Sequence, residues 1–228
     1  MPEDEHPPLE RSSAENYNYF TLPMALNYQR NSYTLWESAR LTYGDPDTRD
    51  VFDPAAAAEM DMEELRAKLV KYKVALQPNK QPLVWRTLCV TIMEQLEGDL
   101  RHLFRMNENS VQRIKQYILL RKKSFPYLGG NKIMNYWLYV MEQYTDTSFV
   151  DREYITVAPD THVVQSSIRL GLITAEEAAG PRVQELVAVR WEEVLRGSEY
   201  CPIDIHTPMW LWSRGKFAAD YNSRVILL

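Results

Sequence analysis

The sequence predicts an all-α fold. Apolar residues recur with helical spacing along most of the 228 residues, and no alternating run of useful length indicates a strand. Hydrophobic residues make up 45% of the chain, enough for a sizeable core. We expect one helical domain over residues 15–228, preceded by an acidic, disordered tail over residues 1–14, where no apolar period is present.

Prolines, glycines and capping residues place the individual helices. Pro23 separates a short first helix from a longer one, and helix formers predict a single surface helix over residues 55–75. Pro82 suits the first turn of a helix that ends near Gly98, and Ser110 is the expected start of the next. Further helices are expected over residues 131–144, 161–170, 181–196 and 207–214, with a short capped turn beginning at Thr174.

Composition excludes several classes of protein. No stretch is apolar enough to span a membrane, and the acidic, proline-rich start is unlike a secretory signal, so we expect a cytoplasmic protein without membrane contact. Cys89 and Cys201 are the only cysteines, too few for a disulfide framework or a four-cysteine metal site. His162 and His206 have no ligand cluster around them, which disfavours a metal-dependent nuclease. We expect a monomer that uses no cofactor and no metal.

The charge of the chain is unevenly distributed. Net charge is −5, yet residues 109–141 contain no acidic residue and carry a local charge of +6, which leaves −11 for the remainder. The six basic residues are Arg113, Lys115, Arg121, Lys122, Lys123 and Lys132. This segregation predicts a confined phosphate-binding face. The alternative is an ordinary solvated helix end, where Lys and Arg complement the helix dipole.

Two helices over about residues 110–145 are joined inside this basic segment. The link contains Tyr127, Leu128, Gly129, Gly130 and Asn131, and Lys132 follows it. Paired glycines let a backbone approach a ligand closely, and amides at a helix start bind phosphate, so these residues, with Lys122 and Lys123, are candidate DNA contacts. Glycine-containing links between antiparallel helices are common, however, and carry no function by themselves.

A second segment follows 28 residues beyond Lys132. Asp160 opens the sequence Asp-Thr-His-Val, and the helix it begins, over about residues 160–171, ends in Arg-Leu-Gly. Taken alone, this pattern predicts an ordinary N-cap whose carboxylate accepts backbone N–H bonds.

The order and spacing of the two segments resemble the helix-hairpin-helix DNA glycosylase superfamily. In that family a glycine-containing hairpin ends on a nucleophilic lysine, matched by Gly130-Asn131-Lys132, and a Val-Asp-Thr-His segment carries the essential aspartate, matched by Asp160. The resemblance is specific over roughly residues 110–172. The long gap from Lys132 to Asp160 is similar to that of archaeal-type 8-oxoguanine glycosylases, and the segment His206-Thr-Pro-Met-Trp210 is similar in spacing to a late segment of that subgroup. Two departures are His206, which replaces an acid, and Leu128, which displaces the first hairpin glycine.

The resemblance implies a glycosylase-like fold with the active site in a cleft between two helical subdomains. It implies an enzyme that flips a base out of DNA and cleaves its N-glycosidic bond, with Asp160 stabilising the sugar cation and Lys132 as a nucleophile that could add lyase activity. The expected partner is DNA with a damaged or modified base, either an oxidised purine or a hypermodified phage base such as glucosylated hydroxymethylcytosine. The corresponding roles are DNA repair and anti-phage defence.

Base-binding residues are harder to assign from sequence. Aromatic side chains hold flipped bases by stacking, so Trp36, Tyr136, Trp137 and Trp210 are candidates, although such residues on apolar helix faces more often belong to the core. Gln29 and His206 are candidates to contact polar base edges.

Two other functions stay open. One is hydrolysis of a free modified nucleoside or nucleotide, because queuosine-salvage N-glycosidases resemble this fold; the basic segment disfavours it. The other is a non-enzymatic DNA-binding module. The presence of both Lys132 and Asp160 argues against it, because a module without chemistry needs neither.

Overall fold

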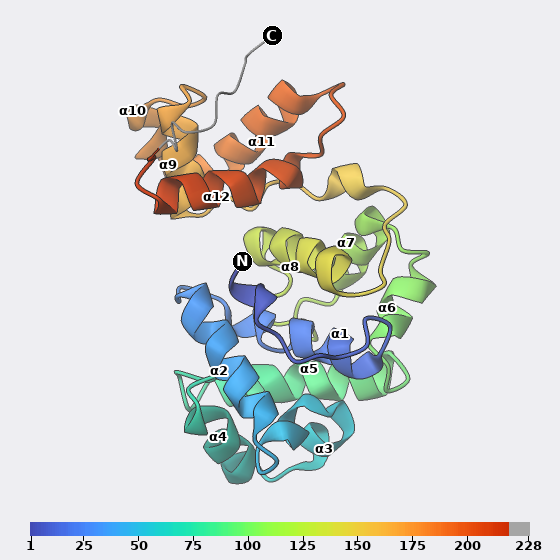
Figure 1. Cartoon of the computed structure of the whole chain (residues 1–228). Coiled ribbons are helices and arrows are strands. Elements are labelled where there is room, and N and C mark those ends of the chain that lie inside the picture. The colour runs from blue at the N-terminus through green and yellow to red at the C-terminus, as the bar shows by residue number, and fades with distance from the viewer. Residues whose placement is uncertain (219–228) are drawn as a thin grey trace. The chain divides into compact units, whose positions relative to one another are not determined.

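A computed structural model describes residues 1–218. These residues form helices and no strands, which confirms the all-α prediction for the described chain (Figure 1). Contacts divide the chain into two compact units, Met1–Tyr154 and the residues from Ile155 onward. The expected domain over residues 15–228 spans both units, and the second unit encloses a hydrophobic cluster of its own. Within residues 1–218, no helix has the length and apolar character needed to cross a bilayer.

The first unit contains eight α-helices among its described residues. They are α1 (Ala14–Thr21), α2 (Ser32–Gly44), α3 (Pro54–Glu59), α4 (Met62–Lys71), α5 (Gln81–Gln95), α6 (Arg101–Met106), α7 (Val111–Leu120) and α8 (Asn131–Tyr144). Four short 3-10 helices accompany them: η1 (Pro2–Asp4), η2 (Met24–Leu26), η3 (Arg49–Phe52) and η4 (Arg152–Tyr154). Aromatic side chains fill the core, where Tyr19 stacks on Phe52 and the ring of Phe52 meets Trp85 edge-on.

The expected helix over residues 55–75 is wrong in one respect, because it is split into α3 and α4. Asp61 causes the break: its Oδ1 accepts hydrogen bonds from the Glu63 and Glu64 amides and so caps a new helix. Met60 ends α3 in an extended conformation. Local propensity favours helix on both sides of Asp61, so only the capping contact separates α3 from α4.

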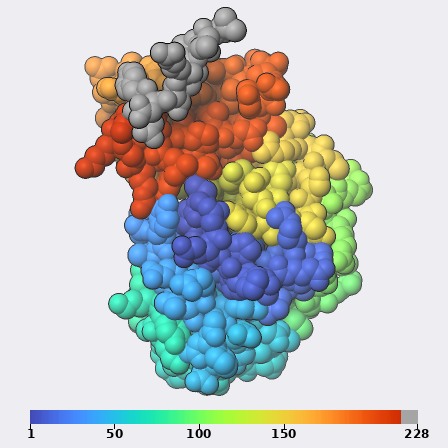
Figure 2. Space-filling view, viewed as in Figure 1, coloured from blue at the N-terminus to red at the C-terminus, as the bar shows by residue number. Residues whose placement is uncertain are grey.

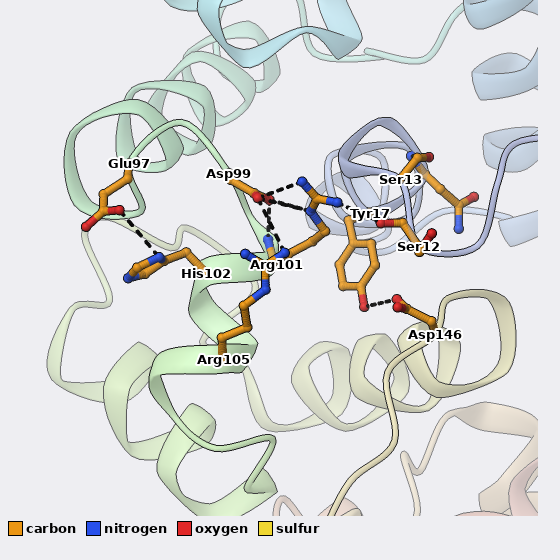
Figure 3. Close-up of polar contacts among 10 residues, drawn as sticks. Ser12, Ser13, Tyr17, Glu97, Asp99, Arg101, His102, Arg105 and Asp146 are labelled. Atoms are coloured by element: carbon orange, nitrogen blue, oxygen red, sulfur yellow. Dashed lines mark hydrogen bonds and ion pairs between the residues drawn. The ribbon is translucent and has the colours of Figure 1, made fainter.

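Residues 1–14 lie against the helical body and do not form the expected disordered tail. Arg101 donates to the Ser12 carbonyl at 2.9 Å, and Tyr17, in the helix that follows, donates to Asp146 at 2.6 Å (Figure 3). Arg11 donates to the Gln143 carbonyl at 2.7 Å. The segment, dark blue in Figure 2, runs beside α2 and α8. These long-range contacts have no signature in the local sequence, which explains the incorrect expectation.

The second unit is built around α9 (Thr161–Arg169). Its other helices are α10 (Ala175–Ala178), α11 (Val183–Leu195), the 3-10 helix η5 (Pro202–Ile205) and α12 (His206–Arg214). Val163, Val187, Trp191 and Met209 belong to its buried cluster, and the Trp191 indole donates to Ser167 Oγ at 2.9 Å. The predicted capping box is present in the turn at Thr174.

Candidate functional site

The predicted hairpin is formed by α7 and α8. Ser110 caps α7 through the Arg113 amide, as expected, and the Asp151 carboxylate adds contacts to Ser110 Oγ and to the Val111 and Gln112 amides. Helix α8 covers the expected residues 131–144. The start of α7 is therefore fully capped by side chains.

The link between these helices turns at Tyr127, one of the predicted DNA contacts, and not at its paired glycines. Tyr127, and neither glycine, has a left-handed backbone, with φ of 63°. A side chain at Gly130 would come within 3.3 Å of the Tyr127 carbonyl oxygen, so close approach accounts for glycine there. The Leu128 side chain is buried, which corrects its assignment as a DNA contact: only its backbone remains available.

Helix α8 starts with open amides. Its N-cap is Gly130, which has no side chain to accept from the first turn, and the first helical bond runs from the Met134 amide to the Gly130 carbonyl at 2.8 Å. Within the described residues, the amides of Asn131, Lys132 and Ile133 meet no acceptor. A helix start with open amides and a positive dipole end can bind an anion.

Three exposed lysines of the hairpin form no ion pair inside residues 1–218: Lys132 in the first turn of α8, and Lys122 and Lys123 before the link. The other three cations of the basic segment have partners, and the Arg121 guanidinium lies 4.0 Å from the centre of the Tyr117 ring. Lys115 donates to Asn135 and to the Tyr154 carbonyl, both at 2.6 Å, and Arg113 pairs with Glu108. The free positive charge is thus concentrated at the link and at the first turn of α8.

Two residues beside the link were missed by sequence analysis. The ring of Tyr28, 54% exposed, lies 5.5 Å from that of Tyr127, and the Lys80 ammonium lies 5.2 Å from the Tyr127 ring. Both come from distant parts of the sequence, so no local signal could have found them. Gln29, a predicted base contact, is exposed in the same loop as Tyr28 and has a left-handed backbone.

Tyr136 lies one turn beyond Lys132 on the same face of α8. Its hydroxyl donates to Glu3 Oε1 at 3.0 Å, and its burial raises its pKa well above the ordinary value. Glu3 was not predicted as a site residue, yet its side chain is 1% exposed, and burial raises the pKa of its carboxyl to about 7. The Tyr136 hydroxyl offsets part of that rise.

Trp36 and Trp137 are core residues, which corrects their assignment as base-stacking side chains. Both are at most 2% exposed. Trp36 packs against Tyr19 and Phe20, and the Trp137 indole donates to Thr21 Oγ1 at 2.9 Å. Neither ring offers a free face to a base.

Asp160 is the N-cap of α9 in the second unit, as the sequence predicted. Its Oδ1 accepts the Val163 amide at 2.9 Å, and the residue is partly exposed. This bond orients the carboxylate and leaves the other oxygen without a hydrogen bond from the described residues. The geometry is that of an N-cap with one carboxylate oxygen left for another contact.

The remaining predicted residues of this unit gather around α12. His206 and Trp210 lie one turn apart on that helix, and both are buried. The His162 ring meets Trp210 edge-on at 5.5 Å, and its Nδ1 lies 3.1 Å from Ser213 Oγ. His162 follows Asp160 by two residues, in the first turn of α9.

Residues 1–218 contain no group of three His, Cys, Asp or Glu side chains that would hold a metal ion. A scan of the sequence against protein-family models finds no match, and a search of curated proteins finds none with significant similarity.

Proposed function

We propose that this protein is a DNA glycosylase that excises a damaged or modified base and leaves an abasic site. The observation that carries the proposal is the start of α8, where open amides and the exposed Lys132 amine occur together, with Lys122 and Lys123 close in sequence. Amides and ammonium groups bind a DNA phosphate, and an amine beside that phosphate is suited to react with the sugar. On this proposal the fold is that of the helix-hairpin-helix glycosylases, with the active site in a cleft between two helical subdomains.

The chemistry assigns one role to each candidate. Breaking the bond between C1′ and the base leaves positive charge on the sugar, which an ionised carboxylate stabilises, and this is the role of Asp160. The Lys132 amine then adds to C1′, and the resulting imine allows strand cleavage. If Lys132 only contacts phosphate, water adds instead and the enzyme is monofunctional.

The test uses two sets of DNA. One carries oxidised, deaminated and alkylated bases, and the other is purified from phages with hypermodified cytosines. We expect abasic sites in one set, which identifies both the reaction and the role in repair or phage defence. DNA binding without base release would favour a non-enzymatic binding module. If the protein neither binds DNA nor releases a base, but hydrolyses free modified nucleotides, the nucleotide hydrolase is favoured.

Asp160→Asn provides the decisive variant. Asparagine caps helices as well as aspartate does, so we expect base release to fall at least about 100-fold while the unfolding temperature and the DNA affinity stay near the parent values. Asp61→Asn is the matched control, because Asp61 caps α4 in the same way. Base release at the parent rate by Asp160→Asn would exclude Asp160 as the stabilising carboxylate.

A further inference from the structure

A pocket of about 300 Å³ lies along α8 beyond Lys132, inside the first unit. Its walls come from α8 and from the N-terminal segment, and they include Met1, Glu3, Asp4, Tyr136, Tyr139 and Tyr144. The rings of Tyr136 and Tyr139 lie 6.1 Å apart. A volume of this order is at the lower end for small-molecule sites, and aromatic walls suit a flat ligand.

Glu3 is the unusual group in this pocket. Tyr136 donates to its Oε1, but Oε2 is buried and has no hydrogen-bond partner among residues 1–218. The indole nitrogen of Trp36 faces the same carboxyl and lowers its pKa in part, yet it also completes no hydrogen bond there. A buried carboxyl oxygen without a partner is costly, and a ligand that hydrogen-bonds to it would remove that cost.

The surroundings of Glu3 favour its neutral form. The titratable groups that face it are Tyr136, Tyr139 and Tyr144 from α8, Tyr19 from α1, and Asp4 and the Met1 amino group from its own segment. The Met1 amino group is the one positive charge in this set, and Asp4 also pairs with it. Burial dominates and raises the pKa of the Glu3 carboxyl to about 7. A neutral carboxyl donates one hydrogen bond and accepts another, side by side.

We propose that Glu3 binds the excised base and pairs with a basic ring nitrogen and its neighbouring exocyclic amino group, the edge that cytosine and adenine share. The carboxyl O–H donates to the ring nitrogen, and the other oxygen accepts from the amino group. Tyr136 supports the carboxyl from one side, and its position one turn from Lys132 places the pocket on the helix that carries the reactive amine. This inference rests on the proposed function, because it assigns the base-binding part of that site.

Glu3 would also supply a proton to the reaction. As the bond between C1′ and the base breaks, its electron pair stays with the base, and the Glu3 proton moves to the ring nitrogen. The base leaves neutral, Glu3 remains as a carboxylate, and the sugar cation is balanced by Asp160 until water or Lys132 adds to it. Glu3 then regains a proton from solvent.

Binding of free bases tests the pocket independently of excision. We would titrate the protein with 1-methylcytosine, 9-methyladenine and 1-methyluracil by calorimetry at pH 6. We expect at least one amino base to bind about fivefold or more tightly than 1-methyluracil, and Glu3→Ala to abolish that binding. Equal affinity for all three bases, or unchanged affinity in Glu3→Ala, would overturn the assignment.

Glu3→Gln separates recognition from proton transfer. The amide donates and accepts in the same places, so free-base binding should persist, whereas the excision rate should fall by about 100-fold. The parent rate should decline as pH rises through about 7, where Glu3 loses its proton, and the variant rate should not. Glu5→Gln is the control, because Glu5 is exposed in the same segment.

The outcomes distinguish the two proposals. If a base is released but Glu3→Gln keeps the parent rate and pH profile, the role of Glu3 is refuted while the glycosylase assignment stands. If no DNA loses a base, the proposed function is refuted, and the free-base titration alone decides whether Glu3 forms a binding pocket.

Discussion

Lys132 and Asp160 are held in different ways. The Lys132 amine is exposed at the first turn of a helix that lacks a side-chain cap, whereas the Asp160 carboxylate is oriented by the Val163 amide. An exposed amine can reach a bound substrate from several rotamers, and an oriented carboxylate can stabilise charge without reorganising. The two residues are thus suited to nucleophilic and electrostatic roles, respectively.

Lys132→Gln should remove covalent chemistry and leave binding largely intact. We expect loss of borohydride trapping and of strand nicking, because glutamine cannot form an imine. The measurement is trapping at saturating DNA, with Lys123→Gln as the control in the same segment. A Lys132→Gln protein that still traps would show that another amine is the nucleophile.

Glu3 should make stability depend on pH. Its carboxyl has a pKa of about 7 in the folded protein and about 4.5 as the ordinary value, so between these pH values the folded state holds a proton that the unfolded chain has released. Stability from this group is complete below pH 4.5 and is lost as pH rises through 7, by roughly 3 kcal/mol in total. The parent should therefore lose stability on alkalinisation.

Urea unfolding at pH 5 and pH 8.5 measures this effect. Glu3→Gln stays neutral, so its free energy of unfolding relative to the parent should increase by about 2–3 kcal/mol between the two pH values. Glu5→Gln, which changes an exposed side chain, should show no such difference. A constant gap between Glu3→Gln and the parent would mean that the folded-state pKa is not raised.

At the scale of elements, the contrast between α7 and α8 is informative. Side chains of Ser110 and Asp151 cap the start of α7, whereas the start of α8 is left open, in a hairpin with three unpaired lysines. The amides of a capped helix start are already hydrogen-bonded, whereas the free amides of an open helix start can bind an anion. The asymmetry of the hairpin therefore favours phosphate binding at α8.

The salt dependence of DNA affinity tests that interpretation. Replacing both Lys122 and Lys123 by Gln should reduce the slope of log affinity against log salt concentration by about 2, because each lysine releases roughly one counterion from DNA. The matched control replaces Lys68 and Lys71 on α4, which pair with Asp50 and Asp45. An equal change in the control would show that net charge, and not the hairpin, controls binding.

At the scale of the molecule, the chain forms two units with separate hydrophobic clusters. Trp137 is central to the first and Trp191 to the second. Removing either ring leaves a cavity that costs about 3–5 kcal/mol. The loss of protection should be confined to the unit that contains the cavity, because units with their own cores open separately.

Hydrogen exchange of two variants measures this independence. Trp191→Ala should accelerate amide exchange in α9, α11 and α12 and leave exchange in α5 and α8 unchanged. Trp137→Ala should accelerate exchange in α5 and α8 and leave exchange in α9, α11 and α12 unchanged. A uniform acceleration along the described chain in both variants would mean that the units unfold as one.

Local patterns were sufficient for much of this description. Helical spacing predicted α8 and α12 closely, and capping residues located the starts of α7 and α9 at Ser110 and Asp160. Helix formation and capping depend on residues within one or two turns, so the sequence by itself determined the helical class, the hairpin and the placement of Lys132 and Asp160 at helix starts.

Tertiary structure alone decided the rest. It placed Glu3 against Tyr136, across 133 residues, brought Tyr28 and Lys80 to Tyr127, and buried Trp36 and Trp137 in the core. It also separated the chain into two units and docked residues 1–14 on the first. Burial and long-range hydrogen bonds depend on which distant segments meet, and that information is absent from any local pattern of residues.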